Sequence, residues 1–205
     1  MDIAFQVRSG IAAISLLNKR LGVLATTSVL GALMFRQVKG QPWRGLPSPA
    51  DEKEKLTREQ AGPAILLYRV LCDRMPQQDA LDLTADIATE GALIFLRQTI
   101  PTIRAAEMNA LSDEQRLEFL QGIQGKFFNA DAGDYTIGET DFSFLIQRCR
   151  FPELCKATGH PELAPVFCKG DGLFFERHQP EVLFSREHTL ARDGQPCDFS
   201  FQLKD

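Results

Sequence analysis

The sequence predicts an α+β fold in which a helical layer packs on an antiparallel sheet. Three observations predict it. Apolar residues recur at helical spacing through the middle of the chain. In the C-terminal third they alternate with polar residues, as in a half-buried strand. An Asp-Gly turn signal then separates the last two alternating segments, which is typical of a β-hairpin at the end of the chain.

The chain has 205 residues, of which 44% are hydrophobic, and this length suits one domain with an appended arm. We divide it into an N-terminal apolar helical arm with a linker, residues 1–50, and one α+β domain, residues 51–205. The net charge is −4 and no Lys/Arg cluster occurs. This argues against a nucleic-acid partner, which requires a concentrated basic face.

The N-terminal arm is apolar over residues 3–35, with scattered charges. Its uncharged run from Gly22 to Phe35 has fourteen residues, whereas a helix needs about 20 to cross a bilayer. Three interpretations stay open: a helix buried on the domain or on a second subunit of a homo-oligomer, a helix on a membrane surface, and an ill-packed arm. Residues 36–50, rich in Gly and Pro, read as a linker.

The middle of the chain predicts amphipathic helices. Apolar side chains repeat at helical spacing over 64–74 and over 79–98. Ser112, followed three residues later by Gln115, has the pattern of a capping box and opens a third helix. Glu90 lies among apolar neighbours in the longest helix. Most such glutamates face solvent, and the alternative is that Glu90 projects into a pocket.

The C-terminal third predicts the sheet. The predicted elements are a strand over 134–147, helices over 151–158 and 161–175, and two strands over 182–190 and 197–203 joined by a turn at 192–195. This turn would place residue 188 near residue 199 and residue 190 near residue 197, so that His188 and Cys197 reach one pocket.

Sulfur and imidazole are concentrated in the last sixty residues, which favours one shared site. An odd number of cysteines in a chain of this size is not a secreted disulfide framework, so we expect free thiols in a reducing, cytoplasmic compartment, with the arm as the one candidate for membrane contact. The crowded residues are Cys149, Cys155, His160, Cys168, His178, His188 and Cys197.

A metal site is the alternative use of these residues. Three cysteines and one histidine suit tetrahedral zinc. No Cys-x-x-Cys pair occurs, however, and His160 and His178 stand beside or near prolines in predicted loops, as surface residues do. We therefore expect no cofactor and keep zinc as the alternative.

Two segments carry a family resemblance. They are RCRFPELCKATGHPELAPVFCKGDGLFF, residues 148–175, and HTLARDGQPCDFSF, residues 188–201. With them the chain resembles the L-2-amino-thiazoline-4-carboxylic acid hydrolase family over about residues 60–205. The C-terminal Gly-x-x-Cys-x-Phe is more weakly similar to vinyl reductase-type ligand-binding domains, which implies helices packed on an antiparallel sheet around a ligand pocket.

The resemblance implies that water opens a small cyclic amidine, at a C–N bond, in a biosynthetic or degradative pathway. In the reaction that gives the family its name, a 2-aminothiazoline ring becomes an N-carbamoyl cysteine. The alternative is a non-catalytic module that binds a small ligand with the same fold, with or without zinc.

The chemistry requires a nucleophile, a proton shuttle and stabilisation of a tetrahedral intermediate. Cys168 is the first choice for the nucleophile, with Cys149 and Cys197 as alternatives and His188 as the base. Asp171 shares a helix face with Cys168 and would orient His188 or activate water. Arg148 would hold a substrate carboxylate. The residues assigned to substrate binding are Arg148, Glu90 and Cys155.

Overall fold

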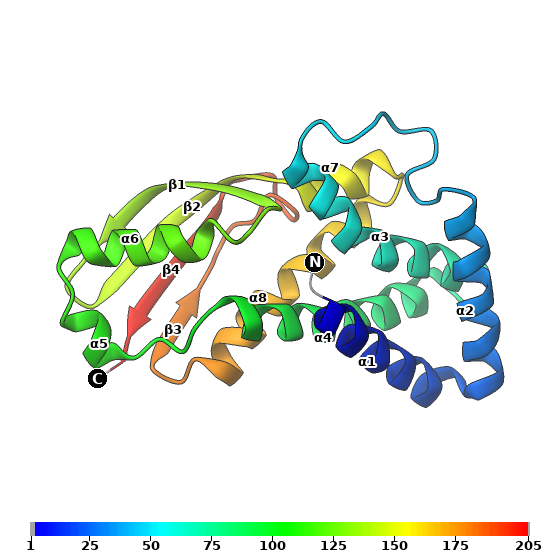
Figure 1. Cartoon of the computed structure of the whole chain (residues 1–205), viewed down its shortest axis with the longest axis horizontal. Helices are drawn as coiled ribbons and strands as arrows, with labels where there is room; N and C mark the ends of the chain where they lie inside the picture. Colours follow the sequence, from blue (N-terminus) through cyan, green and yellow to red (C-terminus); the bar gives the residue numbers. More distant parts are fainter. Residues whose placement is uncertain (1–2, 205) are drawn as a thin grey trace.

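Two long helices, α4 (Gln77–Thr99) and α8 (Ala164–His178), connect a helical half of the molecule to a half that contains a sheet in the computed structural model (Figure 1). The structure describes residues 3–204. The other elements, in chain order, are α1 (Ile3–Leu21), α2 (Val23–Val38), α3 (Glu52–Cys72), α5 (Ala105–Asn109), α6 (Asp113–Gln124), β1 (Ala130–Ile137), β2 (Asp141–Cys149), α7 (Arg150–Ala157), the 3₁₀ turn η1 (Pro161–Leu163), β3 (Val182–Ser185) and β4 (Cys197–Leu203).

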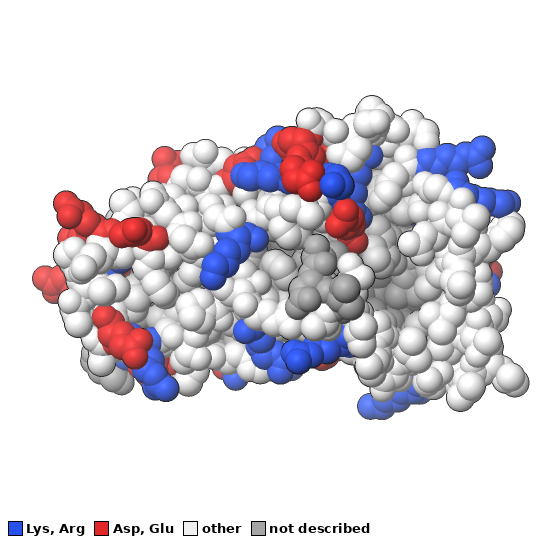
Figure 2. Space-filling view, in the orientation of Figure 1, with Lys and Arg blue, Asp and Glu red and all other residues white. Residues whose placement is uncertain are grey.

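The helical half has its own hydrophobic core. Ile65 and Leu71 of α3 are fully buried in it, together with Leu17 of α1 and Val29 of α2. α1 packs on α4 and α2 packs on α3, so both N-terminal helices rest on the domain. Their outer faces form a broad area with little charge on the right of the molecule (Figure 2). This arrangement agrees with the interpretation that the arm packs on the domain.

The sheet is antiparallel throughout, with strand order β1-β2-β4-β3. Phe142 pairs with Phe201 and Phe144 with Phe199 across β2 and β4. Because side chains alternate along a strand, these rings share the inner face of the sheet. α6 packs on β1 and α8 packs on β3, and the second hydrophobic core lies between the sheet and these helices (Figure 1).

The single strand predicted over 134–147 is wrong, because the segment is a hairpin. The backbone turns after Ile137, where the N–H of Gly138 donates to the carbonyl of Asp141 over 2.8 Å. Strand β2 begins only there and runs to Cys149. The alternation of Phe142, Phe144 and Ile146 was interpreted correctly, but Gly138 and its polar neighbours form the turn.

In the predicted C-terminal hairpin the second strand, 197–203, is confirmed as β4, whereas the first strand is shorter than predicted and the loop is longer. β3 ends at Ser185, which pairs with Ser200, so His188 is not on a strand. The reason is local hydrogen bonding, because the Asp198 carboxylate accepts the backbone N–H of His188 over 2.6 Å in place of a strand partner. The expected proximity of residues 190 and 197 is nevertheless confirmed, since the N–H of Leu190 lies 3.4 Å from Cys197 Sγ.

The helical predictions agree better with the structure. The helix over 79–98 and the capping box at Ser112 are confirmed. The helix over 64–74 is the second half of α3, which begins at Glu52 after its N-cap Asp51. The N-terminal arm forms two helices because Gly22 adopts a φ of 82°, a left-handed conformation that ends α1 before α2 begins. No helix among residues 3–204 has the length and apolar character needed to cross a membrane.

Candidate active site

A cavity of about 140 Å³ lies between the inner face of the sheet and helices α4, α6 and α8. Its wall is predominantly apolar, and nine of the chain's 15 phenylalanines line it. The strands contribute rings at alternate positions, and the helices contribute rings from the opposite side. Ligand sites of enzymes are typically apolar clefts with a few polar groups. The lining phenylalanines are Phe95, Phe127, Phe142, Phe144, Phe151, Phe167, Phe175, Phe199 and Phe201.

The polar groups of this cavity come from segments far apart in the sequence. Cys149 lies at the end of β2, Cys168 and Asp171 on α8, and Cys197 at the start of β4. Arg186 reaches the cavity from the residue after β3. Three of the predicted cysteines and the predicted aspartate therefore line one cavity. Three side-chain amide groups also line the cavity, those of Gln60, Gln124 and Asn129.

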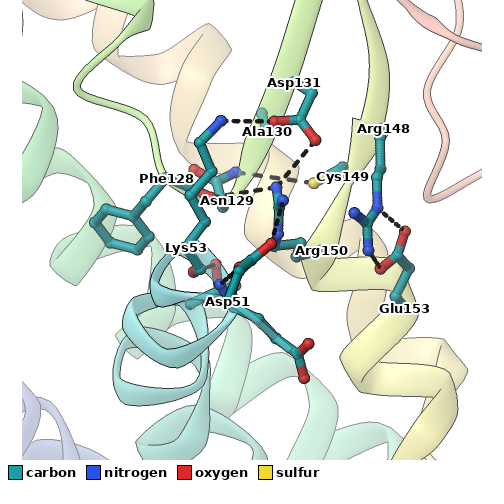
Figure 3. Close-up of polar contacts among 12 residues, drawn as sticks. Asp51, Lys53, Phe128, Asn129, Ala130, Asp131, Arg148, Cys149, Arg150 and Glu153 are labelled. Carbon is teal, nitrogen blue, oxygen red and sulfur yellow. Dashed lines mark hydrogen bonds and ion pairs between the residues drawn. The ribbon is translucent and has the colours of Figure 1, made fainter. Parts of the chain in front are cut away.

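Cys149 occupies the N-cap position of helix α7. The Asn129 side-chain amide donates to its sulfur over 3.8 Å (Figure 3). Burial raises the pKa of the Cys149 thiol to about 11, and the backbone N–H of Phe151 and the Asn129 amide oppose the rise because they favour the thiolate. Cys149 is thus one of two cavity thiols that have a hydrogen-bond donor in place, and the other is Cys197, to which the N–H of Leu190 donates.

Cys168 and Asp171 lie three residues apart on α8, on the face that meets the cavity. Cys168 Sγ lies 3.9 Å from the Ala164 carbonyl. Burial raises the pKa of this thiol strongly, and the nearby Asp171 raises it further. Burial also raises the pKa of Asp171, while Arg186 opposes that shift by donating from Nη1 to Asp171 Oδ2 over 2.9 Å. Asp171 and Arg186 form an ion pair at the cavity wall.

Two further cysteines are buried. Cys197 lines the cavity, and burial raises the pKa of its thiol although the N–H of Leu190 donates to the sulfur. Cys155 lies in the core of the helical half and is not among the cavity residues. Burial raises its pKa to about 12. The surroundings of Cys155 are those of a core side chain rather than a substrate contact.

The structure places three other predicted residues away from the cavity. His188 is 42% exposed, and its Nδ1 lies 3.1 Å from Asp193 Oδ2, so the expected pairing with the cavity cysteines does not form. Arg148 donates to both oxygens of Glu153 over 2.8 Å on the surface (Figure 3). Glu90 is partly exposed on α4 and does not line the cavity.

The remaining histidines are also elsewhere. The ring of His160 accepts a hydrogen bond from Arg69 and contacts Glu162 in the helical half. His178 ends α8 and packs on Phe174. Within residues 3–204, no three side chains of His, Cys, Asp or Glu approach closely enough to hold a metal ion.

Arg186 and Asn129, the two cavity residues that bind a predicted site residue through their side chains, were missed from the sequence. Arg186 stands two positions after Phe184 in a segment of alternating character. This alternation was the signal that could have placed Arg186 on the same inner face as Phe184. Its side chain also packs over the ring of Phe199, 5.1 Å from the centroid. Asn129 precedes β1 in a connecting segment, where no periodic pattern indicates a direction.

A buried arginine holds the segment that carries Asn129. The backbone N–H of Arg150 donates to the Asn129 carbonyl over 2.7 Å. Its guanidinium reaches the Phe128 carbonyl, Asp131 and Asp51 over 3.2–3.4 Å. Figure 3 shows this guanidinium between the two aspartates, beside the contact of Asn129 with Cys149. Arg150 therefore links the start of α3 to the strand that borders the cavity.

Comparison with known families gives one match. The family model described as L-2-amino-thiazoline-4-carboxylic acid hydrolase matches residues 57–201, which include every residue of the cavity. No curated protein and no solved structure matches the chain.

Proposed function

The chain belongs to the L-2-amino-thiazoline-4-carboxylic acid hydrolase family, and from this premise we propose that its cavity hydrolyses a small cyclic amidine with a cysteine nucleophile. One observation carries the proposal: three thiols, a carboxylate and a guanidinium face a single apolar cavity of about 140 Å³. A cavity of about 150 Å³ in another protein binds benzene. The size and lining therefore favour a substrate with one small ring.

The ion pair in the wall favours a ring that carries both charges. Asp171 offers a carboxylate to a protonated amidine, and Arg186 offers a guanidinium to a carboxylate. An aminothiazoline carboxylate has both groups. Arg186 takes the role that we assigned to Arg148 from the sequence, because Arg148 is engaged by Glu153 on the surface.

We assign the nucleophile to Cys149 rather than to Cys168. The Asn129 side-chain amide donates to the Cys149 sulfur and the N–H of Phe151 also lowers the pKa of this thiol, whereas Cys168 has a carbonyl and a carboxylate beside it. Donors stabilise a thiolate and acceptors disfavour it. Because both thiols are protonated at neutral pH, attack requires a base, and Asp171 is the acidic residue at the cavity wall.

The reaction then balances in two steps. Cys149 Sγ bonds to the amidine carbon while its proton passes through Asp171 to the ring nitrogen, which gives a tetrahedral intermediate. Collapse breaks the ring C–S bond, and the substrate sulfur leaves as a thiol. Water next attacks the same carbon and expels Cys149, which recovers its proton. The product is an N-carbamoyl cysteine.

The ring bond that these two steps cleave differs from the C–N bond expected from the sequence. An N-carbamoyl product keeps the bond between the amidine carbon and the ring nitrogen, so the bond that breaks is C–S rather than C–N. Thiolate is also the better leaving group, since the pKa of a thiol is near 8.5. Cleavage of the C–N bond would instead give an S-carbamoyl product with a free amine and no new thiol.

The test is turnover of 2-amino-thiazoline-4-carboxylic acid by Cys149→Ser. We expect activity to fall by at least about a thousandfold, as for loss of a covalent nucleophile, and Cys72→Ser to keep wild-type activity because Cys72 lies outside the cavity. Mass spectrometry of quenched wild-type enzyme should find an adduct on Cys149 with the mass of the whole substrate, since ring opening releases no fragment. Normal turnover by Cys149→Ser would contradict the assignment.

A ligand-binding module without catalysis is the second candidate, and the raised pKa values of the cavity thiols favour it. It predicts that calorimetry detects binding of the same heterocycle to wild-type protein and that no product forms. Product formation with wild-type protein would exclude this candidate.

A further inference from the structure

Exposed apolar side chains are concentrated on the N-terminal helices. Of the nine large hydrophobic residues that are exposed among residues 4–204, eight lie on α1 and α2. The ninth is Leu183, on the sheet. Single exposed apolar residues are ordinary on a protein surface, whereas a group on one structural unit marks an interaction site. The eight residues are Val7, Ile11, Ile14, Val23, Leu24, Met34, Phe35 and Val38.

The exposed residues follow the spacing of helix faces. Val7, Ile11 and Ile14 are separated by four and three positions, so they form one stripe along α1. Leu24, at 89% exposed, stands beside the Gly22 corner where the two helices meet. Phe35 and Val38 continue along α2, separated by three positions. The opposite faces of these helices are already occupied by packing on α3 and α4.

The charge of the same segment has one sign. Residues 3–50 contain six basic residues and no acidic residue, although the whole chain has a net charge of −4. Arg20 pairs with Asp86 and Arg36 pairs with Asp73, which ties the helices to the domain. The other four, Arg8, Lys19, Lys39 and Arg44, are exposed and make no ion pair with a described acidic side chain. Figure 2 shows basic groups at the margins of the uncharged area over α1 and α2.

We propose that α1 and α2 dock the protein on the surface of an anionic lipid bilayer. Apolar stripes flanked by Lys and Arg are the features that place a helix in the interface of such a membrane. The corner with Val23 and Leu24 enters the headgroup region, and Lys19 beside it meets lipid phosphates. Neither helix crosses the bilayer, in agreement with its length and composition.

The charge favours a membrane over a second copy of the chain. A dimer through this face would bring two groups of like charge together across an apolar contact, which is unfavourable. An anionic surface instead neutralises them. The eight exposed side chains would be buried equally by a membrane or by a second copy of the chain. The positive charge of the segment is therefore the feature that favours the membrane.

The experiment is co-sedimentation of the full chain with phosphatidylcholine vesicles that contain or lack phosphatidylglycerol. We expect binding to the anionic vesicles, weakened by salt, and little binding to the neutral ones. Leu24→Glu should abolish binding. Lys19→Gln should weaken it about fivefold, from about 1 kcal/mol per basic residue near the surface. Leu183→Glu is the control, because it places the same charge on an exposed apolar residue outside α1 and α2, and it should bind as wild type does.

Three outcomes would overturn the proposal. The first is equal binding to neutral and anionic vesicles, and the second is unchanged binding of Leu24→Glu. The third is a dimer in light scattering that Leu24→Glu converts to a monomer, in a protein that does not bind vesicles. Circular dichroism of each variant checks folding. Because the substitutions lie outside the cavity, turnover of the heterocycle is expected to stay unchanged, so this test is independent of the proposed function.

Discussion

Each thiol at the cavity is surrounded by apolar side chains, and this environment controls its reactivity. Burial raises the pKa of Cys149, Cys168 and Cys197, so the neutral thiol is the form that the fold favours. Asp171 adds to the effect at Cys168, because a carboxylate disfavours a second negative charge close by. The thiols therefore react only where a base accepts their proton or where the pH is high.

Alkylation of the cavity thiols by iodoacetamide should reflect their raised pKa values. The rate rises with pH as the thiolate forms, and for Cys149 we expect the midpoint near pH 11, compared with about 8.5 for a free thiol. Asp171→Asn removes a negative charge and leaves Arg186 without its partner, so the midpoint of Cys168 should move to lower pH. Labelling of each cysteine is followed by peptide mass spectrometry, with Cys72 as the internal control. An unchanged Cys168 profile would show that Asp171 does not act on it.

The sequence indicated these thiols but not their partners. Four of the five cysteines lie close together along the chain, and three of these four line the cavity. His188 was expected to join them because alternation extended the strand through residue 190. Asp198 and Asp193 instead bind the backbone and ring of this segment, and side-chain acceptors of that kind leave no periodic signal in a sequence.

Among the elements, prediction succeeded where one periodic pattern decided the structure. Helix α4 has a continuous apolar stripe, and α6 has a capping box whose two hydrogen bonds are both present. The prediction was wrong for residues 134–147, because residues alternate on both sides of Gly138 and the turn there was not recognised. The charged segment DEKEKLTREQ, residues 51–60, was interpreted from the sequence as a solvated helix start, and it forms the first turns of α3, which are held by the N-cap Asp51 rather than by burial of an apolar stripe.

The contact of α4 with α8 depends on a glycine. A Cβ at Gly170 would lie 2.6 Å from the Cβ of Ala92, so the two helices approach more closely than any other residue allows. Gly170→Ala should lower the free energy of unfolding by about 1–3 kcal/mol, because overpacking outweighs the gain in helix propensity. Urea unfolding measures the change.

Gly172 on the same helix is the control for this substitution. A Cβ there meets no atom within 4 Å, so Gly172→Ala gains helix propensity without a clash. It should raise the free energy of unfolding by up to about 1 kcal/mol. If both alanine variants were equally stable, the close approach of α4 and α8 would not be a constraint.

At the scale of the whole molecule, the two hydrophobic cores need connections besides α4 and α8. The Arg150 side chain, only 4% exposed, supplies one, since it reaches Asp51 before α3 and Asp131 on β1. No pattern along the chain predicts this contact, because residues 51, 131 and 150 are far apart in the sequence. Surface ion pairs contribute little, whereas removing one partner of a buried one costs more.

Arg150→Met tests this connection. The loss of charged hydrogen bonds should lower the free energy of unfolding by about 2–3 kcal/mol, and the loosened Asn129 segment should lower turnover as well. Arg148→Met is the matched control two residues earlier. Its pair with Glu153 is about half exposed, so the change should stay within about 1 kcal/mol with turnover unaffected. Urea unfolding and steady-state kinetics measure the two effects. Equal destabilisation by both variants would mean that Arg150 does not join the two halves, since an arginine in an exposed pair would then contribute as much as the buried arginine.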